Sequence, residues 1–519
     1  MIVDFKDIIV NEFYYNKKMK CKVIARDLNT VKIQDCVTDI CMTLSIKEWN
    51  DKGFRSVKME DIVPLNVQNI NIKSYYSIMA NLPIGSQISL TDGTMAVVKS
   101  KLGEGGQGVV YLVTTSTGTD MAFKCYIQIP EDAFFKNLEK LINMPAPSNS
   151  FLWPKAIGSY NNDRCGYIMN LRPNGYHDLS DFFSAGFDGK VKANFVSFSA
   201  KLQAAIQICN GFRKLHIQGL SYQDLNDGSF LINPGTGDVL ICDNDNVCPN
   251  NTSITNILGK ARYMAAEIMG DENGNRTMPN TNSDRLSLAI ILYRLFMLDH
   301  PFEGESIIKI PCLTEEIERR KYGREAVFVY DATDASNRPN TKIHRNSVLF
   351  WSYCPDSLKR MFQKALSHEA IIDPYNRVSD KDWKELFLEL RRKLIVCPKS
   401  PKDKDHDFMT DNIVNKCIRC NDPIVVNTIL HFSDNTDYVV SGHKLIYIGD
   451  EMTPVARGVM RPNDDGTYEQ GVRNISNTTW NIQTPSGKLM QIEPGRNMPL
   501  RNGMQIRFRG DSACKVVVK

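Results

Sequence analysis

The stretch from Leu102 to Tyr111 carries glycines at positions 103, 105 and 108 and a valine at 110, in the order G-x-G-x-x-G-x-V. Strand-like apolar runs precede and follow it, so the pattern predicts two antiparallel strands joined by a tight turn. Glycine lacks a Cβ atom, and such a turn can therefore bring backbone N–H donors close to phosphate oxygens. A plain hairpin can also hold three glycines, so the downstream sequence has to decide between the two interpretations.

Length and composition set outer limits. The chain has 519 residues, which suggests roughly three or four domains, and its net charge of +4 is too small to indicate nucleic-acid binding. The 14 cysteines show no secreted-type spacing and the N-terminus lacks a signal-peptide layout, which predicts a reducing, cytoplasmic location. The longest apolar run, residues 286–298, is too short to cross a bilayer, so we expect a buried helix and no membrane partner.

A lysine follows the glycine-rich run in the next strand-like segment. Residues 121–126 include Ala122 and Lys124. Three consecutive strands, the third with a lysine, resemble the N-lobe of the protein kinase family, and the resemblance implies that Lys124 pairs with the phosphates of ATP. Taken alone, Lys124 would be a solvated strand lysine.

The resemblance also implies a glutamate that pairs with this lysine from the following helix. Residues 134–142 have helical periodicity, and Glu139 lies fifteen residues after Lys124. Glu131 is the alternative, but it stands beside Pro130 at the expected helix start, where a glutamate simply complements the helix dipole.

Residues 166–171 resemble the last N-lobe strand and the hinge that follows it. The resemblance implies that Met169 guards the back of an adenine pocket and that the backbone of Asn170 and Arg172 meets the adenine edge. The nucleotide-binding residues implied in this way are Leu102, Gly103, Gly105, Gly108, Val110, Ala122, Lys124, Met169, Asn170 and Arg172.

Two aspartates follow the long helical pattern of residues 198–215. Asp224 matches the kinase aspartate that orients a substrate hydroxyl and accepts its proton, and Asp243, nineteen residues later, matches the aspartate that holds magnesium. Phosphoryl transfer needs both roles, because the hydroxyl must be positioned while charge on the transferred group is neutralised.

The chain departs from the family around these aspartates. Tyr222-Gln223 replaces His-Arg, so the arginine that reads an activation-loop phosphate is missing and switching by such a phosphate is not expected. Asn226 stands where a lysine is usual, and Ser229 replaces the asparagine that serves as second magnesium ligand. Asp243-Asn244-Asp245 replaces Asp-Phe-Gly, and we expect Asp245 to help hold the metal or its water shell.

Further landmarks follow in order. Glu267 stands where kinases close the activation segment, with Arg377 as its expected buried partner, and Asp284 is expected to hold the backbone of the catalytic loop. The runs 222–229 and 243–245, with an insert at 312–339, resemble one bacterial group, the Ser/Thr kinases associated with tellurium-resistance gene clusters. Members of that group accompany a protein phosphatase and a von Willebrand A-type protein, which the resemblance implies as partners.

Cysteines and a histidine gather after residue 396. The set Cys397, His406, Cys417 and Cys420 has the spacing C-x8-H-x10-C-x2-C, and its second pair is a zinc knuckle. The spacing predicts a small zinc ribbon, although a Cys-x-x-Cys pair in a cytosolic protein can also be two free thiols.

We therefore predict an α+β protein in four parts: a small β-rich domain over 1–82, a two-lobed kinase-like domain over 85–395 (N-lobe about 85–171, C-lobe about 172–395), a zinc ribbon or linker over 396–424, and a β-sandwich over 425–519. Alternating strand patterns with regular turn signals support the sandwich, which resembles a divergent forkhead-associated domain without a clear Ser-x-x-His signature.

The predicted function is an ATP- and magnesium-dependent protein serine/threonine kinase in which Lys124, Glu139 and Asp224 are catalytic and Asp243, Ser229 and Asp245 serve the metal. The alternative is a nucleotide-binding pseudokinase that assembles partners through its flanking domains. The Ser229 and Asn244 replacements favour this alternative.

Overall fold

The computed structural model describes residues 81–184, 190–254, 259–271, 275–397, 406–424, 426–464, 468–510 and 512–518, together with residues 13–15, 20–26, 30–35, 41–45, 49 and 55–56. The chain divides into two compact units, residues 1–75 and 76–519. Within the described residues, no helix is both long enough and apolar enough to span a membrane.

The first unit contains a five-stranded antiparallel sheet in the order β4-β3-β2-β1-β5. Its strands are β1 (Phe13–Tyr15), β2 (Lys20–Arg26), β3 (Thr30–Asp35), β4 (Cys41–Ser45) and β5 (Arg55–Ser56). The segment that the sequence assigned to the end of this domain, residues 57–80, lies outside the described residues.

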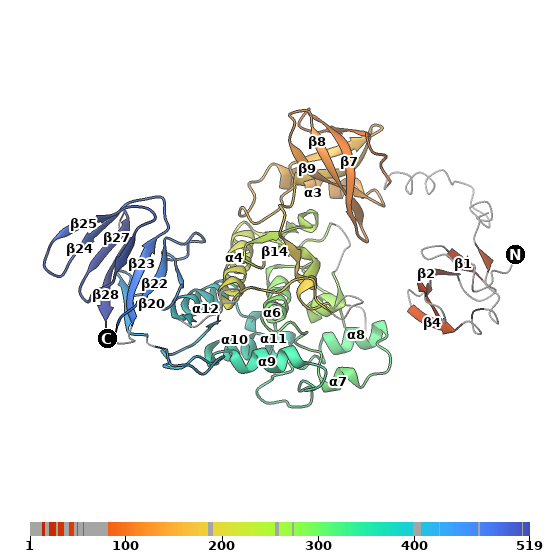
Figure 1. The fold of residues 1–519 in the computed structure, drawn as a ribbon. Helices are drawn as coiled ribbons and strands as arrows, with labels where there is room; N and C mark the ends of the chain where they lie inside the picture. Colours follow the sequence, from red (N-terminus) through yellow and green to blue (C-terminus); the bar gives the residue numbers. More distant parts are fainter. Residues whose placement is uncertain are drawn as a thin grey trace. The chain divides into compact units, whose positions relative to one another are not determined.

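The second unit begins with a closed barrel of six antiparallel strands and one helix, α3 (Asp132–Ile142) (Figure 1). Alternation of buried and exposed residues along β6 and in the first half of β7 places one side of each strand inside the barrel. The barrel order is β10-β11-β9-β8-β7-β6, and the strands are β6 (Gln87–Leu90), β7 (Met95–Glu104), β8 (Gly108–Thr115), β9 (Asp120–Tyr126), β10 (Ala156–Tyr160) and β11 (Asp163–Asn170).

A helical lobe follows, organised around α4 (Phe198–Ile217) and α6 (Thr281–Met297). Both helices are buried on nearly all sides, and the buried residues include polar side chains such as Lys201 and Gln207 on α4 and Asp284 on α6. Ser197 caps the start of α4, because its hydroxyl accepts from Ala200 N, and α6 begins with a capping box between Asn280 and Ser283.

Shorter helices surround this pair. They are α5 (Ala266–Met269), α7 (Glu305–Ile308), α8 (Glu315–Tyr322), α9 (Arg345–Tyr353), α10 (Asp356–Ala365), α11 (His368–Ile372) and α12 (Asp380–Lys393). Small strand pairs carry the loops: β12 (His177–Asp178), β14 (Phe230–Ile232) and β15 (Val239–Ile241) form one sheet, β13 (Leu220–Ser221) pairs with β16 (Cys248–Pro249), and β17 (Ile395–Val396) pairs with β18 (Asp407–Phe408).

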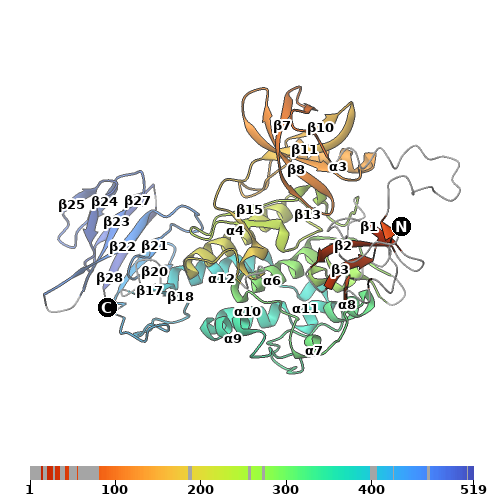
Figure 2. The same cartoon turned by 45° about the vertical axis from the view of Figure 1, so that its right-hand side comes forward.

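The C-terminal strands form two sheets around one apolar core, visible face to face in Figures 1 and 2. The six-stranded sheet has the order β20-β19-β28-β27-β24-β25 and the four-stranded sheet the order β21-β22-β23-β26. The strands are β19 (Thr428–Phe432), β20 (Asp437–Val440), β21 (Leu445–Ile446), β22 (Ala456–Pro462), β23 (Tyr468–Asn474), β24 (Trp480–Gln483), β25 (Leu489–Ile492), β26 (Asn497–Pro499), β27 (Gln505–Arg509) and β28 (Ser512–Val518).

This sandwich packs on the helical lobe through buried polar side chains of α12. The Arg391 guanidinium donates to the carbonyls of Gly449 and Glu451 and lies 4.1 Å from the ring centre of Tyr447. Lys384 Nζ is 2.7 Å from a carboxylate oxygen of Asp450. The residues predicted as a separate sandwich therefore belong to the same compact unit as the helical lobe.

Candidate active site

The loop that carries Asp224 is fixed from below by α6. Asp284, on the first turn of that helix, accepts hydrogen bonds from the backbone N–H groups of Tyr222 (2.7 Å) and Gln223 (3.2 Å), the contact that the sequence predicted. His216 lies between Asp284 (3.1 Å) and Asp380 (3.4 Å). Burial would lower the pKa of His216, but its two carboxylate partners outweigh burial and raise the pKa to about 9. The imidazolium therefore stays charged at neutral pH and holds Asp284 in place.

The Tyr-Gln replacement of His-Arg gives the loop two neutral anchors. The Tyr222 hydroxyl is buried and donates to the carbonyl of Cys242, next to Asp243. Gln223 has a left-handed backbone (φ 72°), and its amide donates to the carbonyl of Thr252 at 2.6 Å. Gln223 thus joins the catalytic loop directly to the start of the activation segment. The arginine expected at this position in the resembled kinases would make that connection through a phosphate group.

Lys124 on β9 reaches across to the acidic residues that follow β15. Its Nζ lies 3.1 Å from Asp243 Oδ1 and 3.0 Å from both carboxylate oxygens of Asp245. Burial would lower the pKa of Lys124, but Asp245 and then Asp243 outweigh burial and raise it. The two acids differ in exposure, since the Asp243 side chain is 48% exposed and the Asp245 side chain 0%.

Asp245, which the sequence predicted to serve the metal, is surrounded by side-chain donors, and its role toward a metal stays a prediction. Besides Lys124, it accepts from the hydroxyls of Tyr126 (2.8 Å) and Tyr167 (3.3 Å). Burial, followed by the charge of Asp245, raises the pKa of both tyrosines well above the usual value. A fully buried carboxylate whose two oxygens face a lysine and two tyrosines serves as the anionic partner of the lysine, and Asp243 is the acid that remains open.

The predicted pair of Lys124 with Glu139 is not formed. Glu139 lies on the outer side of α3, 49% exposed, and its carboxylate is 3.2 Å from Arg164. The side of α3 that faces the molecule carries Phe134, whose ring packs edge-on against Tyr126, and Asn137, which donates to the carbonyl of Val247. The lysine therefore takes its acid from the segment after β15, where Asp245 stands in place of the usual glycine.

The glycine-rich run spans the end of β7 and the start of β8 and is closed by a hydrogen bond from Gly105 N to Gly108 O of 2.9 Å. Gly108 is required for packing, because a Cβ there would lie 2.6 Å from the carbonyl oxygen of Cys125 on β9. A Cβ at Gly103 or Gly105 would meet open space, so the tip is accessible to a ligand.

Apolar residues predicted to contact adenine share one cluster that spans the two lobes. Ala122 and Met169 are opposite each other on β9 and β11 and are buried, and Val110 packs against the same cluster. Leu231 on β14 joins them from the helical lobe, a contribution that the sequence interpretation did not include. Leu102, Asn170 and Arg172 are exposed at the margin.

Ser229 is held in a capping box rather than pointing freely toward a ligand. Its hydroxyl accepts from Asn226 N (3.2 Å) and donates to the carbonyl of Asp224 (3.3 Å), and the side chain is buried. The half-exposed carboxylate of Asp243 has the oxygen chemistry that Mg²⁺ prefers and fits a cation site. Ser229 fits that site less well, because its hydroxyl proton and one lone pair are already used.

Asn244 replaces the phenylalanine of the usual motif with a hydrogen-bonded amide. Its Nδ2 donates to the carbonyls of Leu152 (3.0 Å) and Ile241 (2.9 Å), and the residue is fully buried. These bonds tie the start of the activation segment to the strands beside it, so the polar replacement stabilises one arrangement of Asp243.

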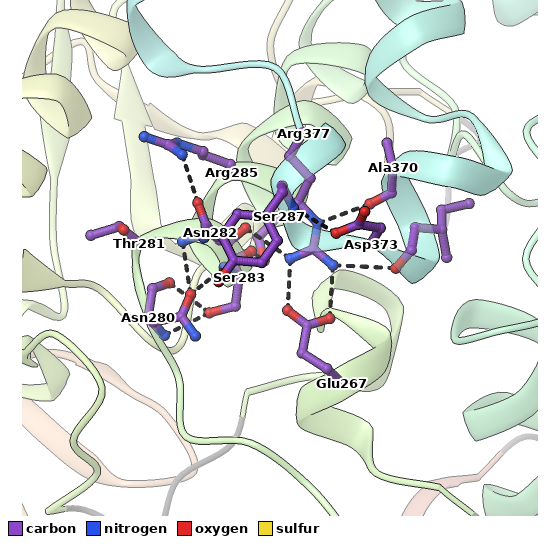
Figure 3. A network of polar contacts seen from close by, with 12 residues as sticks. Glu267, Asn280, Thr281, Asn282, Ser283, Arg285, Ser287, Ala370, Asp373 and Arg377 are labelled. Carbon is purple, nitrogen blue, oxygen red and sulfur yellow. Dashed lines mark hydrogen bonds and ion pairs between the residues drawn. The ribbon is translucent and has the colours of Figure 1, made fainter.

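The end of the activation segment is locked by the predicted pair of Glu267 and Arg377 (Figure 3). Both guanidinium NH₂ groups lie 2.7 Å from the two carboxylate oxygens. The remaining donors bind the carbonyls of Ala370, Asn282 and Ile371. A bidentate pair with every N–H engaged is a strong and rigid connection.

The four predicted zinc ligands also come together. One ligand atom from each of Cys397, His406, Cys417 and Cys420 lies within 4.8 Å of the others. Cys397 and Cys420 Sγ are 3.7 Å apart, close to the sulfur separation of about 3.8 Å that a tetrahedral site with Zn–S bonds of about 2.3 Å requires. The donor set and its spacing fit zinc.

Comparison with known proteins agrees with this geometry. The model of the protein kinase domain matches residues 96–385, and the chain belongs to that family. A curated relative, a probable serine/threonine-protein kinase of Dictyostelium discoideum, is 27% identical over 222 residues, which are 41% of this chain. The match spans 22% of the length of that relative.

Proposed function

We propose that this chain is an active protein kinase that transfers the γ-phosphate of ATP to a serine or threonine hydroxyl of a protein. The observation that supports this most is the gathering of Lys124, Asp243 and Asp224. Lys124 lies 3.1 Å from Asp243, and both are close enough to Asp224 to influence its pKa. Charge that develops on a transferred phosphoryl group needs such fixed partners.

Each residue has a separate task in this proposal. Asp224 orients the substrate hydroxyl and accepts its proton, Lys124 meets the nucleotide phosphates, and the glycine-rich run offers backbone N–H groups from above. Asp243 would hold Mg²⁺, which neutralises phosphate charge when bound. Val110, Ala122, Met169 and Leu231 would enclose adenine between the lobes. Because Asp245 keeps Lys124 in place from behind, the lysine does not depend on Glu139.

The test is transfer from radiolabelled ATP to a Ser/Thr peptide library, followed by phosphoamino-acid analysis. Asp224→Asn and Asp243→Ala are each expected to lower kcat by at least about 10²-fold, the usual contribution of a positioned general base or of a charge that stabilises the transition state. Asp356→Asn is the control, because that side chain is 74% exposed at a helix start. Transfer that is unaffected by both active-site variants would contradict the proposal.

The second candidate function is a nucleotide-binding scaffold. It is favoured by the hydroxyl of Ser229, which is engaged within its own loop, and by Lys124, which contacts two carboxylates at once. Nucleotide binding in the full chain without transfer that depends on Asp224 would support this candidate. In that case the sandwich and the cysteine cluster would serve as docking modules.

The remaining proposals concern the origin, location and partners of the protein and the role of its sandwich. From the resemblance to tellurium-resistance-associated kinases we propose a bacterial, cytoplasmic protein with a cognate phosphatase and a von Willebrand A-type protein as partners. For the sandwich we propose a docking role similar to that of forkhead-associated domains.

We also propose that the cysteine cluster binds one zinc ion and thereby supports α4. Asp407, next to His406, accepts hydrogen bonds from the N–H groups of Phe198 (2.8 Å) and Ser199 (2.6 Å) at the start of that helix. Because α4 forms the base of the catalytic lobe, metal binding and lobe stability are coupled.

One zinc per chain is expected in purified protein by elemental analysis. Cys417→Ser should lose it and lower the unfolding temperature by about 5–10 °C, as expected for a loss of a few kcal/mol in a protein of this size. Cys312→Ser, at an exposed thiol, should change neither quantity. Full stability of Cys417→Ser without metal would show that the cysteines are free thiols.

A further inference from the structure

The catalytic loop lacks the cation that its position 226 would supply in the resembled kinases, yet a lysine lies beside it. Lys260 Nζ is 2.9 Å from Asn226 Oδ1. The Asn226 amide in turn donates to Asp224 Oδ1 and to the Asp224 carbonyl, each at 3.1 Å. Asn226 is therefore a bridge that connects an ammonium group to the carboxylate proposed to accept the proton.

The backbone around Lys260 is fixed by local contacts. The preceding Gly259 has a φ of +92°, and a Cβ at that position would lie 3.5 Å from Asp224 Oδ1 and 3.4 Å from the Gln223 carbonyl oxygen. After it, the Lys260 carbonyl accepts from the N–H groups of Tyr263 (2.9 Å) and Met264 (3.1 Å). The activation segment thus runs directly over the catalytic loop, and Lys260 starts from a defined point.

The side chain of Lys260 is oriented by polar neighbours and is still exposed enough to move. It is 62% exposed and lies 3.8 Å from Asp227 Oδ1 in addition to its contact with Asn226. Asp227 is already engaged by Arg294 at 3.4 Å, so Lys260 is not needed to neutralise it. A flexible lysine stem can move its ammonium group over a few ångströms, from Asn226 toward a ligand on Asp224.

We propose that Lys260 of the activation segment is a catalytic residue that contacts the γ-phosphoryl group during transfer, taking over the charge that Asn226 cannot provide. The proposal rests on the proposed kinase function. In the step itself, the substrate hydroxyl oxygen forms a bond to the γ-phosphorus and the bond from phosphorus to the β,γ-bridging oxygen breaks. ADP leaves with that electron pair, and the hydroxyl proton passes to Asp224. The Lys260 ammonium stabilises the non-bridging oxygens and is not consumed.

In this proposal the positive charge has moved from position 226 of the catalytic loop to Lys260 of the activation segment. Asparagine at 226 cannot carry charge, but its oxygen accepts from Lys260 and its nitrogen donates to Asp224, so it can orient both groups. Burial raises the pKa of Asp224, whereas the hydrogen bond from Asn226 and then the charge of Lys260 act in the opposite direction. Lys260 is thus close enough to act on the same centre.

The test measures transfer from radiolabelled ATP to a Ser/Thr peptide library by the whole chain. The variants move the positive charge from Lys260 of the activation segment to position 226 of the catalytic loop. Lys260→Met is expected to lower kcat by about 10²-fold with the KM for ATP changed by less than about three-fold, as expected for an interaction made mainly in the transition state. The double variant Asn226→Lys/Lys260→Met is expected to recover at least about ten-fold of that loss. Lys309→Met, at a lysine 72% exposed just after α7, is the control and should retain wild-type kcat.

The outcomes separate this inference from the function it rests on. If wild type transfers phosphate in an Asp224-dependent manner and Lys260→Met keeps its kcat, only the role of Lys260 is overturned. That role is also overturned if Lys260→Met is impaired and the double variant is no better, because a purely structural lysine cannot be replaced from position 226. If wild type shows no Asp224-dependent transfer, both the kinase function and the role of Lys260 fall.

Discussion

Asp245→Ala is expected to lower the free energy of unfolding of the kinase domain by about 3–5 kcal/mol, a typical cost of removing one partner from a buried ionic cluster. The variant removes the carboxylate that faces Lys124, Tyr126 and Tyr167, so two buried hydroxyls lose an acceptor and the lysine loses one of its two anions. Urea unfolding of the full chain measures the loss. Asp163→Asn, an exposed aspartate on the same strand as Tyr167, is the matched control.

A second variant at position 245 tests whether Asp245 supports Lys124 or binds magnesium. Asp245→Asn keeps the shape but removes the charge, and we expect weaker ATP binding and lower stability even in the absence of Mg²⁺. A metal ligand would behave differently, because its loss would lower affinity for Mg²⁺ and leave the metal-free protein as stable as wild type. Wild-type unfolding of Asp245→Asn without metal would therefore contradict the contacts described for Asp245.

Why the sequence identified Lys124 but not its acid follows from the geometry of α3. Glu139 has the right distance along the chain, but each helical residue turns by about 100°. The buried residues of α3 are Phe134, Phe135, Asn137, Leu138 and Leu141, so Glu139, four residues after Phe135, lies at the edge of the buried side. Counting residues located the helix, but the apolar pattern does not say which way an edge residue turns, and Glu139 pairs with Arg164 at the surface.

Side-chain contacts between segments that are far apart in sequence could not be predicted, because no local pattern connects the partners. Tyr126 and Tyr167 read as ordinary strand tyrosines, and their common partner comes 119 and 78 residues later. Lys260 likewise has no local pattern that connects it to Asn226, 34 residues earlier. The order of the landmarks, by contrast, could be predicted, because each one depends on a short motif. The contact of Asp284 with the backbone of the catalytic loop and the pair of Glu267 and Arg377 are both formed as expected.

Arg377→Met is expected to destabilise the helical lobe by about 3–5 kcal/mol, since it leaves the Glu267 carboxylate without its buried partner. The Arg377 side chain is 1% exposed, and its five N–H donors bind Glu267 and the carbonyls of Asn282, Ala370 and Ile371 (Figure 3). Arg377→Lys keeps the charge but not the planar fork, so we expect it to recover only part of the loss. Arg319→Met, at an arginine 47% exposed on α8, should change stability by less than about 0.5 kcal/mol.

A double-variant cycle shows how much of this loss belongs to the ion pair. Glu267→Gln/Arg377→Met removes both charges, so it should be more stable than Arg377→Met with Glu267 intact, with a coupling energy of about 1–3 kcal/mol. Additive effects would mean that the carbonyl contacts of Arg377 alone hold α6 and α11. Because Glu267 follows directly on the segment that carries Lys260 and Tyr263, loss of the pair should also lower kcat in parallel with the local loosening. A fully active, destabilised Arg377→Met would show that the catalytic end of the segment is held without it.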